Sequence, residues 1–329
     1  QTTQCLPYAE ARKRGLRRIN KIMRKTILTL VALMGAVVSQ ATILRVNNSP
    51  GSSAQYSDVK TAIDAAAEGD TVLVEGSSTN YGKIDKLDKR IVLRGPGYWL
   101  VENGIAEVGF TSARIPNITV TSPGVVIEGL QITNKVTVKA NNVVVRRCLF
   151  SDANGGLVIN GAKDCVIHQN MFYRCKPSCT DFYVQDRNIQ ITNNIIMGQV
   201  AGFGGSYIAY NTFIVSSSTA ENLFKDITYS TIEHNILPSE AVNSNGWNDT
   251  ESNAKKDNVF MELMKYSEVT TDGSVKDATT TTEAGAFAGD SPYVLGGIPS
   301  GLVLQSLQAP VTIDEGTPFN VSIKVGVVK

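Results

Sequence analysis

Residues 165–172 (CVIHQNMF) decide the fold, because variants of this stretch recur through the middle of the chain. Six copies begin 17 to 24 residues apart, at 125–132, 143–150, 165–172, 189–196, 206–213 and 230–237. The third residue is always Ile or Val, the eighth is always large and apolar, and the sixth is Asn in the last four copies. A repeat that keeps only a few positions is typical of a solenoid, in which each repeat buries its face against its neighbours.

Each copy is expected to be a β-strand with one face turned inward, because its apolar residues at positions one and three follow the two-residue period of a strand. Most copies lie too close together for a helix between them. The simplest arrangement is a parallel coil whose rungs stack about 4.8 Å apart. Further short strands are expected between copies, as at 157–160 (LVIN) and 182–185 (FYVQ).

Two turn positions are expected in each rung. The residues just before the copies are Gly124, Asn142, Asp164, Asn188, Gly205 and Tyr229. Five of these six are types that tolerate a left-handed backbone in a tight turn, so Asp164 is interpreted as a turn residue rather than a catalytic acid. A second turn is expected near the sixth position. The amides there are expected to form a hydrogen-bonded ladder between rungs, as stacked amides do, through Asn170, Asn194, Asn211 and Asn235.

The inward pattern V-x-I-x-x-N-x-F/I resembles the rungs of right-handed parallel β-helix proteins of the pectin-lyase-like superfamily. Residues 56–74 (YSDVKTAIDAAAEGDTVLV) look like the N-terminal entry of that superfamily, where an amphipathic helix runs into the first strand. Residues 91–102 and 284–297 resemble secreted gut-bacterial members. The resemblance covers about residues 41–293 and implies an all-β solenoid. It is specific for the fold and weak for activity, because this fold carries many functions.

The β-helix is expected over residues 42–300, with a capping helix at 56–68 that covers its open N-terminal end. Val59, Ile63 and Ala66 share one helical face, and Gly69 is placed as the helix stop. Residues 301–329 are expected to form a short C-terminal β-hairpin tail. This tail is too short to be an independent domain.

The segment before the coil has the features of a secretory signal. Basic residues at Arg24 and Lys25 precede an apolar run at 26–38, and Ser39-Gln40-Ala41 is a small-residue cleavage site. The run is shorter than the ~20 residues that span a bilayer, which disfavours a membrane anchor. We expect residues 1–22 to be a non-structural leader and 23–41 a signal peptide. The mature chain is expected to be secreted, periplasmic or at the cell surface, without a transmembrane segment.

The charge balance argues against nucleic-acid binding. The chain has 31 Lys and Arg against 30 Asp and Glu, and residues 1–41 hold eight of the basic residues and one of the acids. Cleavage after Ala41 would leave 23 basic and 29 acidic residues, a net charge of −6. A basic footprint for nucleic acid is therefore absent. An anionic polysaccharide would need a local basic patch.

The cysteines are expected to be structural. Cys148 and Cys165 occupy repeat positions six and one, which favours buried free thiols. Cys175 and Cys179 lie four residues apart, and a local disulfide between them is possible in an oxidising compartment. A metal site is less favoured, because neither histidine has ligand spacing to this pair. We predict no metal site and no cofactor.

No catalytic set is recognisable in the sequence. The outward fourth position carries Glu128 and Glu233, but these lie five rung spacings apart, about 24 Å. Glycosidase carboxylates stand only about 5–9.5 Å apart. The Asp-Asp and Gly-His-Gly motifs of the polygalacturonase-like hydrolases are not present. The acid cluster that would hold Ca²⁺ in pectate-lyase-like enzymes is not recognisable.

The remaining candidates are outward or loop side chains. Arg146 and His168 stack on one outward column with Arg147 beside them, and aromatic residues that could stack on sugars follow further along. For all of these, a solvated or packed surface is the alternative interpretation. The candidate substrate-binding residues are Arg146, Arg147, His168, Tyr207, Tyr210 and, in the loop 239–256, Trp247.

Two functions fit these residues. The first is a secreted or cell-envelope β-helix protein that serves as a non-catalytic glycan-binding or adhesion scaffold, with a polysaccharide as its partner. The alternative is a polysaccharide lyase or glycoside hydrolase that acts on acidic polysaccharide near Arg146 and His168. A clear scaffold without an identifiable catalytic set favours the first hypothesis.

Overall fold

The structure is a computed structural model that describes residues 41–106, 110–180, 186–214, 223–238, 247–249, 252–262, 265–279, 283–299, 301–308 and 322–328. The predicted leader (1–22) and most of the predicted signal peptide (23–41) lie outside the described residues, and so does the strand expected at 182–185. Among the described residues, no helix is both long enough and apolar enough to cross a membrane.

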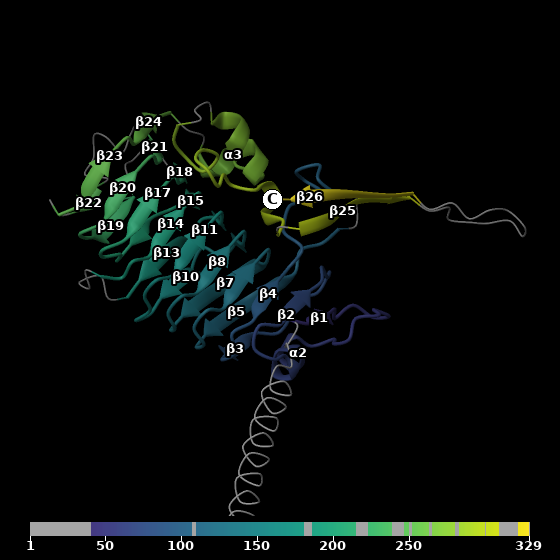
Figure 1. The fold of residues 1–329 in the computed structure, drawn as a ribbon. Helices are drawn as coiled ribbons and strands as arrows, with labels where there is room; N and C mark the ends of the chain where they lie inside the picture. Colours follow the sequence, from purple (N-terminus) through teal and green to yellow (C-terminus); the bar gives the residue numbers. More distant parts are fainter. Residues whose placement is uncertain are drawn as a thin grey trace, which may run out of the picture. The chain divides into compact units, whose positions relative to one another are not determined.

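Parallel strands build a coil of stacked rungs (Figure 1). The first sheet has ten strands, in the order β1-β2-β4-β6-β8-β11-β14-β17-β20-β23. Their bounds are β1 Ile43–Val46, β2 Thr71–Val74, β4 Val92–Arg94, β6 Val126–Glu128, β8 Val144–Arg146, β11 Val166–His168, β14 Gln190–Thr192, β17 Tyr207–Ala209, β20 Thr231–Glu233 and β23 Ala254–Lys256. Six of these strands lie in the first halves of the six repeat copies, namely β6, β8, β11, β14, β17 and β20.

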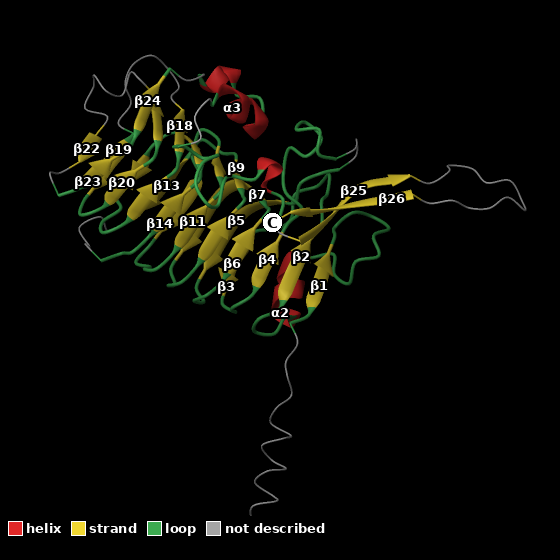
Figure 2. Ribbon diagram, turned by 45° about the horizontal axis from the view of Figure 1, so that its top comes forward, coloured by secondary structure: helices red, strands yellow, loops and turns green. Residues whose placement is uncertain are grey.

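The second sheet has fourteen strands and contains two columns that meet at the long strand β7. The first column is β7 Gln131–Val138, β9 Leu149–Phe150, β12 Met171–Phe172, β15 Ile195–Met197, β18 Thr212–Ile214, β21 Ile236–Pro238 and β24 Val259–Met261. The second adds β10 Gly156–Ile159, β13 Lys176–Cys179, β16 Val200–Ala201, β19 Phe224–Ile227 and β22 Trp247–Asp249, with β3 Ile84–Leu87 and β5 Arg114–Val120 completing the sheet. Figure 2 labels β7, β9, β18 and β24 of the first column and β13, β19 and β22 of the second. A rung such as β11-β12-β13 therefore holds three strands, and the predicted right-handed parallel β-helix is confirmed.

The core is the inside of the coil, as the repeat predicts. The third residues of successive copies pair in register, so that Val145, Ile167 and Ile191 stack as buried neighbours. Eighth-position rings also stack, with the Phe150 and Phe172 centroids 4.7 Å apart and the rings nearly parallel at 8°. Burying one such side chain contributes about 1.5–3 kcal/mol, so the repeat is itself the main source of stability.

Left-handed turns recur at two columns. All six residues that precede the copies have positive φ, including Tyr229 (φ 50°), whose type did not predict it, and Asp164 (φ 56°). This confirms the interpretation of Asp164 as a turn residue. The second turn lies one position earlier than expected, at the fifth residue of each copy. It comprises Gly129, Arg147, Gln169, Asn193, Tyr210 and His234, all with positive φ.

The asparagine ladder fills the inside of this second turn. The main-chain N–H and the Nδ2 of Asn170 both donate to Oδ1 of Asn194, at 2.8 and 3.0 Å. The same pair of bonds links Asn194 to Asn211, Asn211 to Asn235, and Asn235 to Asn258. Each Nδ2 also donates to a strand carbonyl, as that of Asn194 does to Ile167. The predicted ladder is confirmed and continues one rung further, to Asn258.

The capping helix is α2, which spans Val59–Ala65. Asp58 is its N-cap, and the Asp58 side chain accepts from the N–H of Thr61. Its buried residues are Val59, Ala62 and Ile63, and it lies against β1, β2 and β3 (Figure 1). The helix ends earlier than predicted, with Ala66 as C-cap. The Nζ of Lys89 donates to three carbonyls of its last turn, so glycine is not needed there. Gly69 instead makes the turn into β2.

A second buried cluster lies outside the coil, over the outer face of β9, β12 and β15. Helix α3 (Asp272–Ala278), which the polar sequence did not predict, and residues 283–299 cover Leu149, Met171 and Ile195 there. Two short 3-10 turns, η2 (Tyr266–Glu268) and η3 (Leu295–Gly297), belong to the same region. The fully buried carboxylate of Asp272 accepts from Tyr293, the Gly296 N–H and Asn103, which holds these segments together.

Strands β25 (Gly301–Gln308) and β26 (Ser322–Val328) pair antiparallel, as expected for the C-terminal hairpin. The disulfide between Cys175 and Cys179 is not formed, which corrects that expectation: Cys148, Cys165, Cys175 and Cys179 are all free and buried. Cys179 ends the extended strand β13, and residues four apart in a strand lie about 13 Å from each other.

We expect loss of one ladder amide to destabilise the whole coil. Asn194→Ala leaves the buried N–H of Asn170 without its acceptor and removes the side-chain donor to the carbonyl of Ile167, and it should lower the free energy of unfolding by about 2–4 kcal/mol. Urea denaturation measures the change. The control is Asn154→Ala on an exposed turn, and equal stability of the two variants would contradict the role of the ladder.

The four thiols should be unreactive in the native protein. Burial raises the pKa of Cys148 to about 12 and that of Cys165 to about 11. A chain beginning at Thr42, kept without reductant, should give no rapid reaction with a thiol reagent and four thiols after unfolding. Two thiols after unfolding would mean that a disulfide forms.

Candidate functional site

The outer face of the first sheet carries a column of fourth-position side chains. Register pairs Arg94 with Glu128, Glu128 with Arg146, and Arg146 with His168. The column then runs through Thr192, Ala209, Glu233 and Lys256. The structure thus places Arg146 and His168 next to each other, as the repeat predicts. The rungs of β8, β11, β14 and β17 separate Glu128 from Glu233, so these two carboxylates are not a pair.

Arg146 is committed to an ion pair. Its Nε donates to Oε2 of Glu128 at 2.7 Å, and Arg94 holds the other carboxylate oxygen. The Glu128 side chain is fully buried, whereas the two arginines are about one third exposed. An unpaired buried carboxylate would cost several kcal/mol, so the arginines neutralise Glu128 rather than stand ready for an anionic ligand.

Arg147 is not a surface cation, which corrects its assignment to the basic cluster. It occupies the left-handed turn position (φ 54°), so its side chain leaves the strand face that carries Arg146. It is buried, and its Nε donates to Gln169 at 2.7 Å while NH1 donates to the carbonyl of Ile298 at 3.0 Å. Arg147 therefore fastens the C-terminal segment to the coil.

Three of the predicted residues meet in one groove of about 390 Å³, which we call the tyrosine groove. His168, Tyr207 and Tyr210 line it from the coil, together with Gln190 and Thr192. Gly289, Asp290 and Ser291 of the C-terminal segment form its other wall. Sequence reasoning missed this wall, because nothing in 284–297 indicates which rungs it crosses.

The side chain of His168 is held on both sides. Its Nδ1 lies 2.8 Å from Oγ1 of Thr192, and its Nε2 lies 3.0 Å from Oγ of Ser291. Burial, together with the charges of Arg147 and Arg146, lowers the pKa of His168 to about 4, although a hydrogen bond to the Thr192 carbonyl acts in the opposite direction. The imidazole is therefore neutral near pH 7 and positions the groove wall.

Tyr207 is anchored at its hydroxyl. The hydroxyl donates to Oε1 of Glu233 at 2.7 Å, and Nζ of Lys256 lies 3.0 Å from Oε2 of the same carboxylate. The hydrogen bond from Tyr207 and the neighbouring lysine lower the pKa of Glu233, so it stays ionised. The ring of Tyr207 is thus fixed as part of the groove floor.

Tyr210 is stacked rather than anchored. Its ring lies 4.8 Å from that of His234 at an interplanar angle of 6°. A Cβ added at Gly289 would come within 3.1 Å of the Tyr210 ring, so this glycine is what lets the C-terminal segment approach closely. The side chain of Asn193 donates to the carbonyls of Ala286 and Ala288, which fixes the segment beside the tyrosine.

Trp247 does not lie in a loop, contrary to expectation. It begins strand β22 and pairs with Phe224 of β19, because the coil resumes for one more rung where the polar sequence suggested an interruption. This places Trp247 in the second sheet, whereas the tyrosine groove lies on the first.

Stability should fall as His168 becomes protonated. Its folded pKa of about 4 lies below the unfolded value near 6.5, so the folded state binds fewer protons in this range. The neutral His168 imidazole therefore makes its full contribution to stability above about pH 6.5, and this contribution is lost as the pH falls towards 4. His168→Gln should flatten this part of the curve of unfolding free energy against pH. An unchanged slope in His168→Gln would contradict the buried neutral state.

The chain has distant likenesses among solved structures. Two crystal structures of the pectin methylesterase from Aspergillus niger match at 12% identity. The deglycosylated form has a TM-score of 0.46, with 68% of this chain and 86% of that chain covered. The form with an N-acetylglucosamine stub has a TM-score of 0.44, with 74% and 97% covered. These likenesses are too distant to support an argument. No curated protein matches the chain.

The family comparison covers most of the coil. Residues 63–296, from the capping helix to the C-terminal segment that closes the tyrosine groove, match the family described as "Periplasmic copper-binding protein (NosD)". The matched region contains the six repeat copies, the asparagine ladder and both walls of the groove. A periplasmic family agrees with the predicted export of the chain. The chain belongs to the NosD family of β-helix proteins.

Proposed function

We propose that this protein is an exported, non-catalytic glycan-binding scaffold whose binding site is the tyrosine groove. This proposal rests on one observation: Tyr207 and Tyr210 line the same groove as several polar groups, on one sheet of the coil. Tyrosine rings offer an apolar face and a polar tip, which suits the alternating apolar and hydroxyl surfaces of a sugar. Gln190, Thr192 and Asp290 supply hydrogen-bonding groups around the rings.

The charges in the groove favour a neutral glycan. Asp290 lines the groove and Glu233 lies beneath Tyr207, whereas His168 is neutral and Lys256 is paired with Glu233. An acidic polysaccharide would meet negative charge there without a free cation from Arg146, which is bound to Glu128. The groove is therefore expected to bind neutral oligosaccharides.

The geometry favours binding over elimination chemistry. A lyase needs a base and a cation that are both available to the uronate. Both nitrogens of His168 already have partners, and Arg147 is buried beneath the C-terminal segment. An assay for unsaturated products on acidic polysaccharides tests this alternative. Product formation that survives in an Arg146→Ala, His168→Ala double variant would place the chemistry elsewhere.

Copper binding, the property in the family description, does not fit the described residues. Proteins bind copper through imidazole, thiolate or thioether groups that converge on one point. Both histidines and every cysteine except Cys5 are described, and in the described part of the chain no three His, Cys, Asp or Glu side chains gather as a metal site. The thiols are buried, and burial raises the pKa of Cys148, Cys165 and Cys175. We therefore carry no copper chemistry over to this chain.

Tyr210→Ala should weaken glycan binding by about tenfold, because the lost ring contact is worth about 1–1.5 kcal/mol. Screening on a glycan array identifies the neutral oligosaccharide, and calorimetric titration then gives the dissociation constant. The matched control is Tyr229→Ala, which removes an exposed tyrosine from the opposite turn of the same sheet. Equal loss in both variants would contradict the tyrosine groove as the site.

A further inference from the structure

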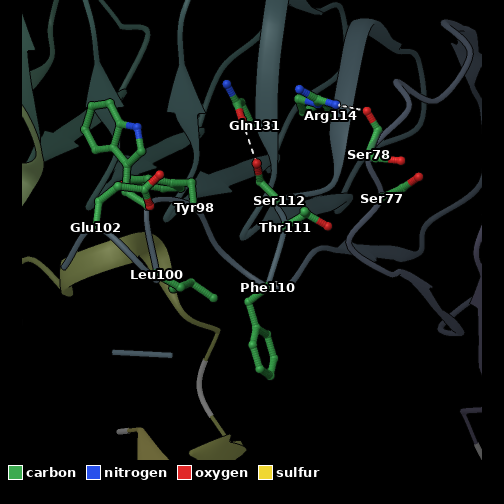
Figure 3. A pocket seen from close by; sticks show the side chains of 11 residues that line it. Ser77, Ser78, Tyr98, Leu100, Glu102, Phe110, Thr111, Ser112, Arg114 and Gln131 are labelled. Carbon is green, nitrogen blue, oxygen red and sulfur yellow. Dashed lines mark hydrogen bonds between the residues drawn. The ribbon is translucent and has the colours of Figure 1, made fainter. Parts of the chain in front are cut away.

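A second pocket, of about 410 Å³, lies where an outer column of the second sheet changes character (Figure 3). Register continues this column from Arg114 to Gln131, Leu149 and Met171. The apolar members are buried beneath α3 and the C-terminal segment. Where that cover ends, the outward residues become Gln131 and Arg114, and the pocket opens over them. The outward side chains of this column are therefore apolar where the C-terminal segment covers them and polar where the pocket exposes them to solvent.

The guanidinium of Arg114 is the main charge in this pocket. It is partly buried, and its NH2 donates to the carbonyl of Ser78. Its Nε is buried without a hydrogen-bond partner, and within the described part of the chain Arg114 has no acidic partner. A buried guanidinium N–H without an acceptor is costly, and a bound anionic group would supply that acceptor.

Neighbouring side chains are already oriented around Arg114. Oγ of Ser112 donates to Oε1 of Gln131 at 2.6 Å, and Nε2 of Gln131 lies 3.3 Å from Oγ of Ser151. These bonds fix the polar floor of the pocket before any ligand arrives. A prearranged floor lowers the entropic cost of binding.

The aromatic wall of the pocket is held in a strained backbone. Trp99 has φ 49°, a left-handed conformation that costs a bulky residue about 1–3 kcal/mol. Its carbonyl accepts from the Asn103 N–H, and its ring packs edge-on against Tyr98 and Tyr173, each at 5.8 Å. Such strain is characteristic of sites where a side chain must be presented in one orientation. Phe110, an exposed aromatic residue, lies near the pocket mouth (Figure 3).

Glu102 limits the choice of ligand. It is exposed and enters from the side of the pocket opposite Arg114 (Figure 3). A multiply charged anion such as phosphate would be repelled by this carboxylate. A ligand with one carboxylate for Arg114 and hydroxyl or ammonium donors for Glu102 satisfies both ends, and its flat or apolar middle can lie against Trp99.

We propose that this pocket binds a small monocarboxylate that carries hydroxyl or ammonium groups at its far end. Arg114 holds the carboxylate, Glu102 accepts from the far-end donors, and Trp99 contacts the body of the ligand. This site lies on the second sheet and does not depend on the tyrosine groove, so either can exist without the other.

Tryptophan fluorescence tests the proposal directly. The chain has two tryptophans, so Trp247→Phe in a chain beginning at Thr42 leaves Trp99 as the sole reporter. The probes are D-glucuronate and 4-(aminomethyl)benzoate, which carry hydroxyl and ammonium donors respectively at the end opposite the carboxylate, with D-glucose and inorganic phosphate as comparisons. We expect saturable quenching by at least one carboxylate, with glucose and phosphate binding about tenfold or more weakly.

Two variants locate the binding groups. In the Trp247→Phe background, Arg114→Gln should weaken carboxylate binding by about tenfold or more, while Arg90→Gln, an exposed arginine elsewhere, should not. Glu102→Gln, an exposed change that leaves the fold intact, should strengthen phosphate binding relative to the carboxylates. The proposal is overturned if no carboxylate quenches Trp99 at about 10 mM, if glucose binds as tightly as the carboxylate that binds best, or if Arg114→Gln binds that carboxylate like its parent.

Discussion

The inward amide at the second turn is the interaction on which the coil depends. Each asparagine from Asn170 to Asn258 satisfies the backbone of its own rung and that of the next, where a left-handed residue turns the chain out of the first sheet. Because the turn is fixed from inside, the preceding strand keeps its register from β11 to β23. The outer column of these rungs and the tyrosine groove follow from that register.

The sequence predicted the inside of the molecule better than the outside. Inward positions such as Ile167 and Phe172 must be apolar in every rung, so their pattern survives in the repeat. The burial of Arg147 depends on its own left-handed backbone and on its hydrogen bond to the distant Ile298 carbonyl. No local sequence pattern encodes that contact. For the same reason, helix α3 and the buried Asp272 were not predicted from their polar surroundings.

The C-terminal segment (283–299) packs against the regular coil and thereby shapes both candidate binding sites. It crosses the second turn of successive rungs, where Arg147, Gln169 and Asn193 donate to its carbonyls. Along this path it closes the tyrosine groove with Asp290 and Ser291, and it locks the loop of Trp99 through the bond from Tyr98 N–H to Gly296. The sequence supplied Tyr207, Tyr210 and His168, whereas only the structure could show what faces them.

We infer that the tyrosine groove binds a neutral glycan without cleaving it. This is tested by NMR of the chain beginning at Thr42, with labelled tyrosine rings, titrated with the oligosaccharide that binds. We expect saturable shifts confined to Tyr207 and Tyr210, with Tyr229 unchanged and the oligosaccharide recovered intact. Shifts elsewhere without shifts at Tyr207 and Tyr210, or a cleaved oligosaccharide, would contradict it.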